Sequence, residues 1–268
     1  MPAIHLAKLR HECVLLASHF DQPGQFVRLT HSLLSSYADR THRTGRSGEP
    51  TPLLLAYNVP KPVLRQILIE INPLIISNQQ GALDLCDQLW DEPFFEMRYL
   101  AVSILGLVSL EPPAPILDRV ISWSSSVSDD QLASLIFDLG LNRMRSESPD
   151  ILIQQISNWL DDADTSNQKL GLQALKPLIA ASKYENTPVF FRQLSPYVRQ
   201  LPPELRNEVR ESVYCLAEQS PVETAHFLRQ YIGISPDAAW LARQCMRLFP
   251  EDIQISLRGL LRSIPSRE

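Results

Sequence analysis

The stretch from residue 88 to residue 105 reads as the end of one helix, a tight corner and the start of a second helix. Asp91 or Glu92 can cap the free N–H groups of the second helix, and Pro93 fits a first helical turn, where its missing N–H costs nothing. Apolar residues then recur at steps of three and four, which predicts one buried helix face. This face consists of Phe94, Met97, Ala101, Ile104, Leu105 and Val108. Two antiparallel helices around a corner are half of a helical repeat.

The pattern of a small residue four positions before a large apolar residue recurs along the chain. The pairs are Ala101 and Leu105, Gly171 and Leu175, Ser212 and Leu216, and Ala242 and Met246. Their spacing is irregular, but paired helices in units of roughly 30 to 45 residues are typical of HEAT-like solenoids. Such pairs also occur in other helical bundles. We predict an all-α chain that forms a HEAT-like right-handed α-solenoid of antiparallel helix pairs.

Composition also favours helices. The chain has 9 glycines and 21 prolines in 268 residues, and many of the prolines stand where helices are expected to begin. Residues 3–38 resemble two helices broken at 21–24. Further helices are expected near 61–77, 79–90, 93–110, 113–127, 129–145, 149–161, 166–182, 188–200, 203–219, 221–232, 236–248 and 251–263.

The strongest loop signal is residues 39–50, which are polar and basic and contain two glycines. This segment is either a surface loop or, through its three arginines, a site that binds phosphate groups. We predict residues 1–50 as N-terminal helices with this basic loop, and residues 51–268 as the repeat array, the whole forming one continuous domain.

Charge and cysteine usage limit the function classes. The formal net charge of −5 does not indicate a nucleic-acid binder, although a solenoid can hold a basic groove on an acidic body. The four cysteines are isolated from one another, which predicts buried, reduced thiols and no metal site. The first residues lack the layout of a signal peptide, and no stretch is apolar enough to span a bilayer. We expect a cytoplasmic protein with no cofactor and no membrane association.

Two local features are candidates for chemistry. The acidic pair Asp129 and Asp130 stands where a helix cap is expected, so capping competes with any catalytic role. Trp123 lies among serines at a helix end, where it is either a wedge between helices or partly exposed. No P-loop, Gly-rich dinucleotide turn or hydrolase motif is present.

Two segments resemble a known family. Tyr57-Asn58-Val59-Pro60 leads to Leu64-Arg65, and about 30 residues later Leu89-Trp90-Asp91-Glu92-Pro93 leads to Glu96-Met97-Arg98-Tyr99-Leu100-Ala101. Their order, gap and residue types are similar to those of the AlkD-like, HEAT-like alkylpurine DNA glycosylases of the DNA alkylation repair family. That family has a Tyr-Gly-Val-type entry where this chain has Asn58. A weaker similarity extends to about residue 232.

The resemblance implies binding of duplex DNA and excision of cationic N-alkylated purines. It places the family's tryptophan at Trp123, its later cation at Lys169 and its later aromatic residue at Tyr214. The catalytic aspartate that should follow Trp123 closely is replaced by serines, and the first carboxylate is Asp129. A carboxylate stabilises the positive charge that develops on the sugar, and a serine does not. The chain is therefore a divergent member, with Asp129 as the candidate catalytic residue or with excision lost.

Two functions stay open. The first is a DNA-binding protein of this family, for which Trp123, Lys169, Tyr214, Arg98, Arg143 and Arg210 are candidate DNA contacts. This hypothesis also expects Lys61, Arg65 and Arg145 near the binding face. The second is a non-enzymatic HEAT scaffold that holds a protein partner in its groove. The sign of charge in the groove distinguishes the two.

Overall fold

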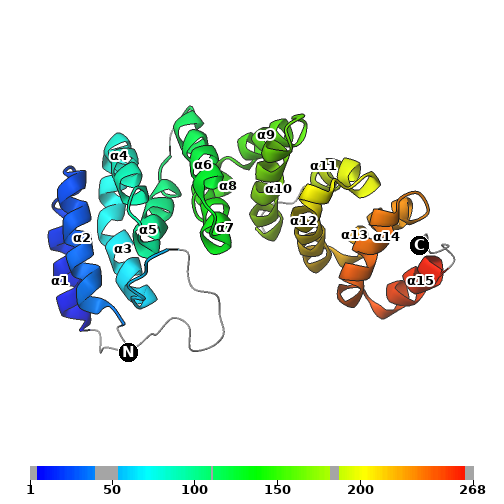
Figure 1. Cartoon of the computed structure of the whole chain (residues 1–268), viewed down its shortest axis with the longest axis horizontal. Helices are drawn as coiled ribbons and strands as arrows, with labels where there is room; N and C mark the ends of the chain where they lie inside the picture. Colours follow the sequence, from blue (N-terminus) through cyan, green and yellow to red (C-terminus); the bar gives the residue numbers. More distant parts are fainter. Residues whose placement is uncertain (1–4, 40–53, 110, 182–186, 263–268) are drawn as a thin grey trace. The chain divides into compact units, whose positions relative to one another are not determined.

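The computed structural model describes residues 5–39, 54–109, 111–181 and 187–262. In these ranges the chain is helical, and its only β contact is an isolated bridge between Leu55 and Phe94. The all-α prediction is confirmed. The chain divides into two compact units, Met1–Glu147 and Ser148–Glu268 (Figure 1). Most of the predicted basic loop, from residue 40 onward, lies outside the described residues, and the predicted boundary at residue 50 stays a prediction.

The first unit stacks pairs of helices. One layer contains α1, α3, α5 and α7, each packed on the next, while α2 and α4 pack together in the other layer. Helices α4 and α5, on either side of the corner, pack against each other most extensively in this unit. The helices are α1 (Leu6–Ala17), α2 (Pro23–Tyr37), α3 (Lys61–Ser77), α4 (Gln79–Trp90), α5 (Phe95–Leu105), α6 (Ala114–Ser126), α7 (Asp130–Asp138) and α8 (Asn142–Glu147).

The second unit repeats this scheme. Helices α10, α12 and α14 pack in series, α11, α13 and α15 form the neighbouring layer, and α9 packs against α10. Within each unit this is the stacking of helix pairs that the sequence predicts, and the right-handed solenoid through both units stays a prediction. The helices are α9 (Pro149–Leu160), α10 (Thr165–Ala180), α11 (Thr187–Arg199), α12 (Arg206–Gln219), α13 (Pro221–Ile232), α14 (Pro236–Cys245) and α15 (Glu251–Arg262), with 3₁₀ turns η1 (Pro203–Leu205) and η2 (Met246–Leu248).

The small residues of the recurring pattern are packing positions. Ala101, Gly171, Ser212 and Ala242 are all buried, on α5, α10, α12 and α14. Gly171 shows why: a Cβ atom added there would lie 2.8 Å from the side chain of Leu160. A small side chain at this place lets α9 and α10 approach closely, and the predicted pattern therefore marks helix contacts.

The corner differs in detail from the prediction. Asp91 ends α4, and α5 begins at Phe95 rather than at Pro93, with no side-chain cap. The reason is a pairing that the sequence does not reveal: the Phe95 N–H donates to the Leu55 carbonyl oxygen at 2.8 Å, which keeps Phe94 extended. The aromatic ring of Phe94 stacks on Tyr57, with 4.5 Å between ring centroids.

The side chain of Glu96 joins the two segments that carry the resemblance. It is 4% exposed, and its carboxylate oxygens accept hydrogen bonds from the backbone N–H groups of Tyr57 and Asn58, at 3.0 and 2.7 Å. Asn58 has a φ of 55°, in the left-handed region that favours glycine and tolerates asparagine. The entry to α3 is therefore held by the first turn of α5.

Two predicted helices end earlier than expected. Helix α5 stops at Leu105 instead of residue 110, and the helix predicted over 129–145 is two helices, α7 and α8. Both breaks occur at glycines that face each other. A Cβ atom on Gly106 would lie 1.8 Å from the carbonyl oxygen of Leu139 and 3.5 Å from the Cα atom of Gly140. Close approach of two chain segments interrupts both helices.

Candidate nucleic-acid interface

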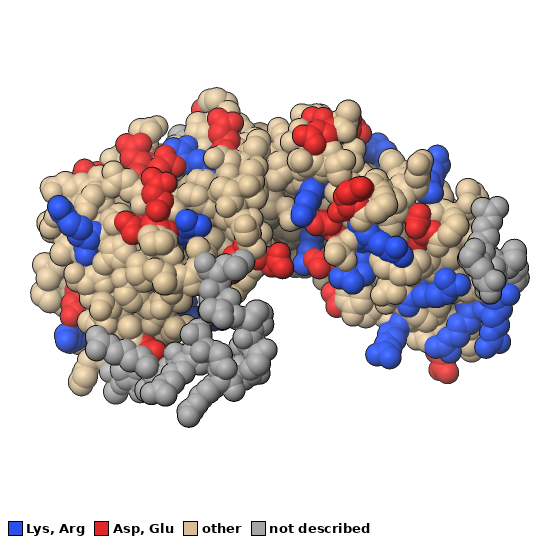
Figure 2. Space-filling model, viewed as in Figure 1, with Lys and Arg blue, Asp and Glu red and all other residues tan. Residues whose placement is uncertain are grey.

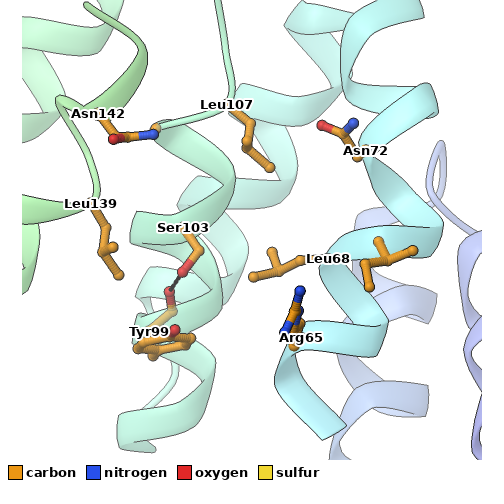
Figure 3. Close-up of a pocket in the computed structure, with 10 residues that line it drawn as sticks. Arg65, Leu68, Asn72, Tyr99, Ser103, Leu107, Leu139 and Asn142 are labelled. Carbon is orange, nitrogen blue, oxygen red and sulfur yellow. Dashed lines mark hydrogen bonds between the residues drawn. The ribbon is translucent and has the colours of Figure 1, made fainter. Parts of the chain in front are cut away.

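A cavity of about 430 Å³ opens on the first unit, between α3, α5 and the segment that joins α7 to α8. We call it the Arg65 cavity. Figure 3 shows the side chains of Arg65 and Tyr99 on neighbouring helices, directed toward the same space. Its lining residues are Arg65, Leu68, Ile69, Asn72, Tyr99, Ser103, Gly106, Leu107, Leu139 and Asn142.

The periodicity of the two helices forms this lining. On α3 the residues that line the cavity recur at i, i+3, i+4 and i+7, and on α5 Tyr99 and Ser103 are four residues apart, which places each set on one face. The core residues of α3, such as Ile67 and Ile71, lie on its other face, whereas Ser103 on α5 is itself buried. The Ser103 hydroxyl donates to the Tyr99 carbonyl oxygen at 2.7 Å, which satisfies the hydroxyl within α5 (Figure 3).

One end of the cavity is fixed by close backbone approach. Gly106 lies against the Leu139 carbonyl, and the Arg143 guanidinium donates to the Leu107 carbonyl oxygen at 2.8 Å. Arg143 also pairs with Glu147, at 2.8 Å. These two interactions join the end of α5 to the segment after α7 and fix this side of the cavity in place.

Arg65 carries the charge of the cavity. Its side chain is exposed, and among the described residues its guanidinium group has no hydrogen-bond or ion-pair partner. No carboxylate belongs to the lining. The Tyr99 hydroxyl also lacks a partner among the described residues. The cavity therefore offers a guanidinium group, a phenol hydroxyl and two amides beside apolar side chains, which suits an anionic ligand with an apolar part.

Other cations predicted for the binding face are engaged in holding the fold. Arg98 donates to the Glu92 carbonyl oxygen at 2.9 Å and lies over the Trp90 ring. Arg145 donates to carbonyl oxygens at the end of α7, and burial lowers the pKa of its guanidinium group. Lys61 is exposed on α3 and does not line the cavity. Of the predicted cations of the first unit, Arg65 is the one that lines the cavity.

Trp123 is buried. It is 5% exposed and stacks on Trp90, with 4.4 Å between ring centroids and 7° between ring planes. The expectation of partial exposure is wrong, because α4 supplies a tryptophan that covers the ring. The alternative interpretation, a wedge between helices, is confirmed. Binding of DNA by Trp123 stays a prediction that requires this stack to open.

Asp129 is the N-cap of α7, and its Oδ1 accepts a hydrogen bond from the Leu132 N–H at 2.9 Å. The capping interpretation is thus confirmed. Asp129 does not belong to the lining of the Arg65 cavity, and its catalytic role stays a prediction.

The candidate DNA-binding residues of the second unit lie on α10 and α12. Lys169 pairs with Glu208 at 3.3 Å, and the neighbouring Lys176 pairs with Glu211 at 2.7 Å. Arg210 is 3.8 Å from Glu211. Tyr214, one helical turn after Arg210, is 40% exposed. Lysines and carboxylates alternate across this helix pair, so its charge is largely neutralised.

The cysteines are buried and unpaired. Burial raises the pKa of the Cys13 and Cys245 thiols to about 12 and that of Cys215 to about 11. Within the described ranges no group of three or more histidine, cysteine or acidic side chains could hold a metal ion. No helix of the described part is both long and apolar enough to cross a bilayer.

The sequence did not single out Asn72, Tyr99 or Asn142 as site residues. The available signal was their place on the polar side of an amphipathic helix, opposite the apolar stripe. Such positions are usually solvated, and these three come together only because α3 packs against α5 and the end of α5 lies against the segment that follows α7. Spatial proximity across helices is the information that the sequence lacks.

Comparison with known proteins gives three results. Residues 53–198 match the family model described as DNA alkylation repair enzyme. No curated protein matches the chain. Among solved structures, the X-ray structure of YibA from Escherichia coli is similar over 98% of this chain and 99% of that chain, at 12% identity and a TM-score of 0.31. A TM-score this low is too weak to support a functional comparison.

Proposed function

Because the chain belongs to the DNA alkylation repair enzyme family, we propose that it binds duplex DNA through the Arg65 cavity. The observation that carries the proposal is the guanidinium group of Arg65, which has no partner among the described residues and lines a cavity without a carboxylate, inside the matched segment. An arginine without a carboxylate partner is free to pair with a phosphate group, which its planar donors fit.

The other lining residues suit the sugar-phosphate backbone. Tyr99 and Asn72 add donors that can reach phosphate or sugar oxygens, and most protein–DNA hydrogen bonds go to such atoms. Leu68 and Ile69 present apolar surface beside Arg65, and Ile69 is 52% exposed. A deoxyribose has one apolar face that can pack there. The cavity thus supports binding of the backbone, and the positive charge favours DNA over the alternative of a scaffold for a protein partner.

We further propose that Asp129 does not catalyse base excision in this chain. Excision requires a carboxylate beside the sugar, where positive charge develops. The Asp129 carboxylate accepts the Leu132 N–H as a helix cap, and no acidic residue lines the Arg65 cavity. These interactions support recognition of DNA without cleavage of the N-glycosidic bond through this residue.

The binding test is fluorescence anisotropy of a labelled duplex over a series of salt concentrations. Arg65→Gln should weaken binding and reduce the slope of log K against log salt by about 0.9, the value for one neutralised phosphate group. Arg28→Gln on α2 is the control, because Arg28 is exposed and its guanidinium group donates to the side-chain oxygen of Gln25. Equal effects of both substitutions, or wild-type binding that ignores salt, would contradict the proposal.

The excision test is release of methylated purines from alkylated duplex DNA by the wild type and by Asp129→Asn. We expect no release from either protein. Release by the wild type that disappears in Asp129→Asn would assign the catalytic role to Asp129 and overturn the second proposal, while the binding proposal would stand.

A further inference from the structure

A second cavity, of about 360 Å³, lies at the end of the chain in the second unit. We call it the C-terminal arginine cavity, and its lining residues are Arg243, Met246, Arg258, Leu261 and Arg262. Figure 2 shows arginine side chains (blue) gathered on the surface over α13, α14 and α15, in the part of the chain that follows the segment matched by the family model.

The local sequence explains how three arginines meet. Arg258 and Arg262 are four residues apart on α15, so they share one face of that helix, and Arg243 stands in the last turn of α14. Met246 follows α14 in the 3₁₀ turn η2, which reverses the chain toward α15. The turn therefore brings the arginine at the end of α14 to the arginine face of α15.

These arginines are not neutralised. Among the described residues none of the three forms an ion pair, and Arg258 donates to the neutral side chain of Gln254, at 2.9 Å. The acidic residues of α15, Glu251 and Asp252, stand in its first turn, and neither lines the cavity. The C-terminal end of a helix carries about half a negative charge. The ends of α14 and α15 together therefore offset about one of the three positive charges, and the cavity keeps a net positive charge.

The cavity contrasts with the rest of a chain whose formal net charge is −5. Lys169 and Lys176 of the same unit, by contrast, have carboxylate partners. Guanidinium groups repel one another when they are gathered without anions, and a bound anion removes that repulsion. Their planar donors match the oxygens of a phosphate group, and Met246 and Leu261 supply apolar surface for the attached sugar.

We infer that the C-terminal arginine cavity binds phosphodiester groups of duplex DNA, as a second binding site outside residues 53–198. The inference rests on the proposed function, which supplies duplex DNA as the polyanion. The cavity adds affinity without sequence choice, because interactions with phosphate groups carry no base information.

The test compares duplex binding by the wild type, by the triple variant Arg243→Gln/Arg258→Gln/Arg262→Gln and by Arg192→Gln over a series of salt concentrations. The control residue Arg192 is exposed on α11 of the same unit and has no partner among the described residues. The triple variant should lower the salt slope by about 0.9 for each phosphate group that it no longer neutralises, and Arg192→Gln should leave the slope unchanged. Thermal unfolding of each variant verifies that the fold is retained.

Arg65→Gln, measured in parallel, separates this inference from the proposed function. An unchanged slope in the triple variant, with weaker binding by Arg65→Gln, would overturn the inference and keep the proposed function. A lowered slope in the triple variant, with full binding by Arg65→Gln, would support the inference and reject the Arg65 cavity as a DNA-binding site. Binding of a polyglutamate probe that disappears in the triple variant, while its DNA binding is unchanged, would assign the cavity to an acidic protein and overturn the inference.

Discussion

The carboxylate of Glu96 holds the backbone of Asn58, with Oε1 2.7 Å from the Asn58 nitrogen. The two residues are 38 positions apart and belong to the two segments by which the family resemblance is recognised. The spacing of these segments thus has a physical cause, since α3 and α4 lie between the turn at Asn58 and helix α5, whose Glu96 holds that turn. Asn58 takes the place of a glycine in the family pattern because both residues accept a positive φ.

Glu96→Gln should destabilise the fold by about 2 kcal/mol, in the range for hydrogen bonds to a buried charged group. The amide NH₂ group of glutamine cannot accept a hydrogen bond, so one of the two backbone N–H groups is left without a partner. Urea unfolding measures the change. Asp118→Asn on α6 is the control, since Asp118 is exposed, and a similar destabilisation of both variants would show that the Glu96 hydrogen bonds contribute nothing specific.

Asn58→Val should cost about 1 to 2 kcal/mol, because a β-branched residue is strained at a φ of 55°. Asn58→Gly should stay within about 1 kcal/mol of the wild type, since glycine adopts this conformation freely. Unfolding midpoints of the two variants, measured side by side, give the comparison. If valine were tolerated as well as glycine, the left-handed conformation at this position would be refuted.

Gly106→Ala should destabilise the first unit, because the new methyl group would lie 1.8 Å from the Leu139 carbonyl oxygen and the backbone would have to move. Overpacking of this kind costs about 1 to 3 kcal/mol. Gly259→Ala on α15 is the matched control, as its Cβ would meet nothing within 4 Å. There the helix propensity of alanine should add about 0.5 to 1 kcal/mol of stability. Opposite signs in thermal unfolding are the expected result.

Asp129→Ala should cost about 1 kcal/mol through loss of the α7 cap, whereas Asp129→Asn should be nearly neutral because asparagine also caps helices. Asp130→Ala, in the first turn of α7, should have a smaller effect than Asp129→Ala. The measurement is the unfolding midpoint of all three variants. An Asp129→Asn protein as unstable as Asp129→Ala would argue against the cap as the role of this side chain.

The buried thiols should make stability fall as the pH rises above about 9. Unfolded thiols ionise near the ordinary pKa of 9.0, whereas the folded pKa of Cys245 is raised to about 12 by burial. Between these values the unfolded state releases a proton that the folded state keeps, so the contribution present below pH 9 is lost toward pH 12. Unfolding midpoints from pH 8 to 10.5 should decline less steeply in Cys245→Ala than in the wild type. Equal slopes would contradict the assignment.

Helix positions were the part of the structure that the sequence predicted well. The apolar stripe around Met97 and Ala101 is buried as expected, because a period of three to four residues has one structural meaning over a long segment. The break between α7 and α8 was missed, since it arises where the end of α5 approaches a chain segment remote in sequence. A single glycine at position 140 does not predict that the end of α5 packs against this segment.

The candidate site was predicted less completely. Arg65 was among the expected cations, but its partners in the cavity were not, because their proximity depends on how three helices pack. The serine neighbours of Trp123 leave open whether it is partly exposed or a wedge between helices, and Trp90 on another helix covers it. A neighbourhood in sequence therefore says little about the environment of a large side chain.

The ion pairs between α10 and α12 have a consequence for the thermodynamics of binding. Lys169 and Lys176 already hold carboxylates, so an arriving phosphate group would undergo ion exchange with Glu208 or Glu211. Exchange of one anion for another yields little net free energy, and the displaced carboxylate would remain close to the phosphate. These two lysines would therefore add little to the binding of a polyanion, and most of the electrostatic affinity of the second unit would come from the arginines of the C-terminal arginine cavity.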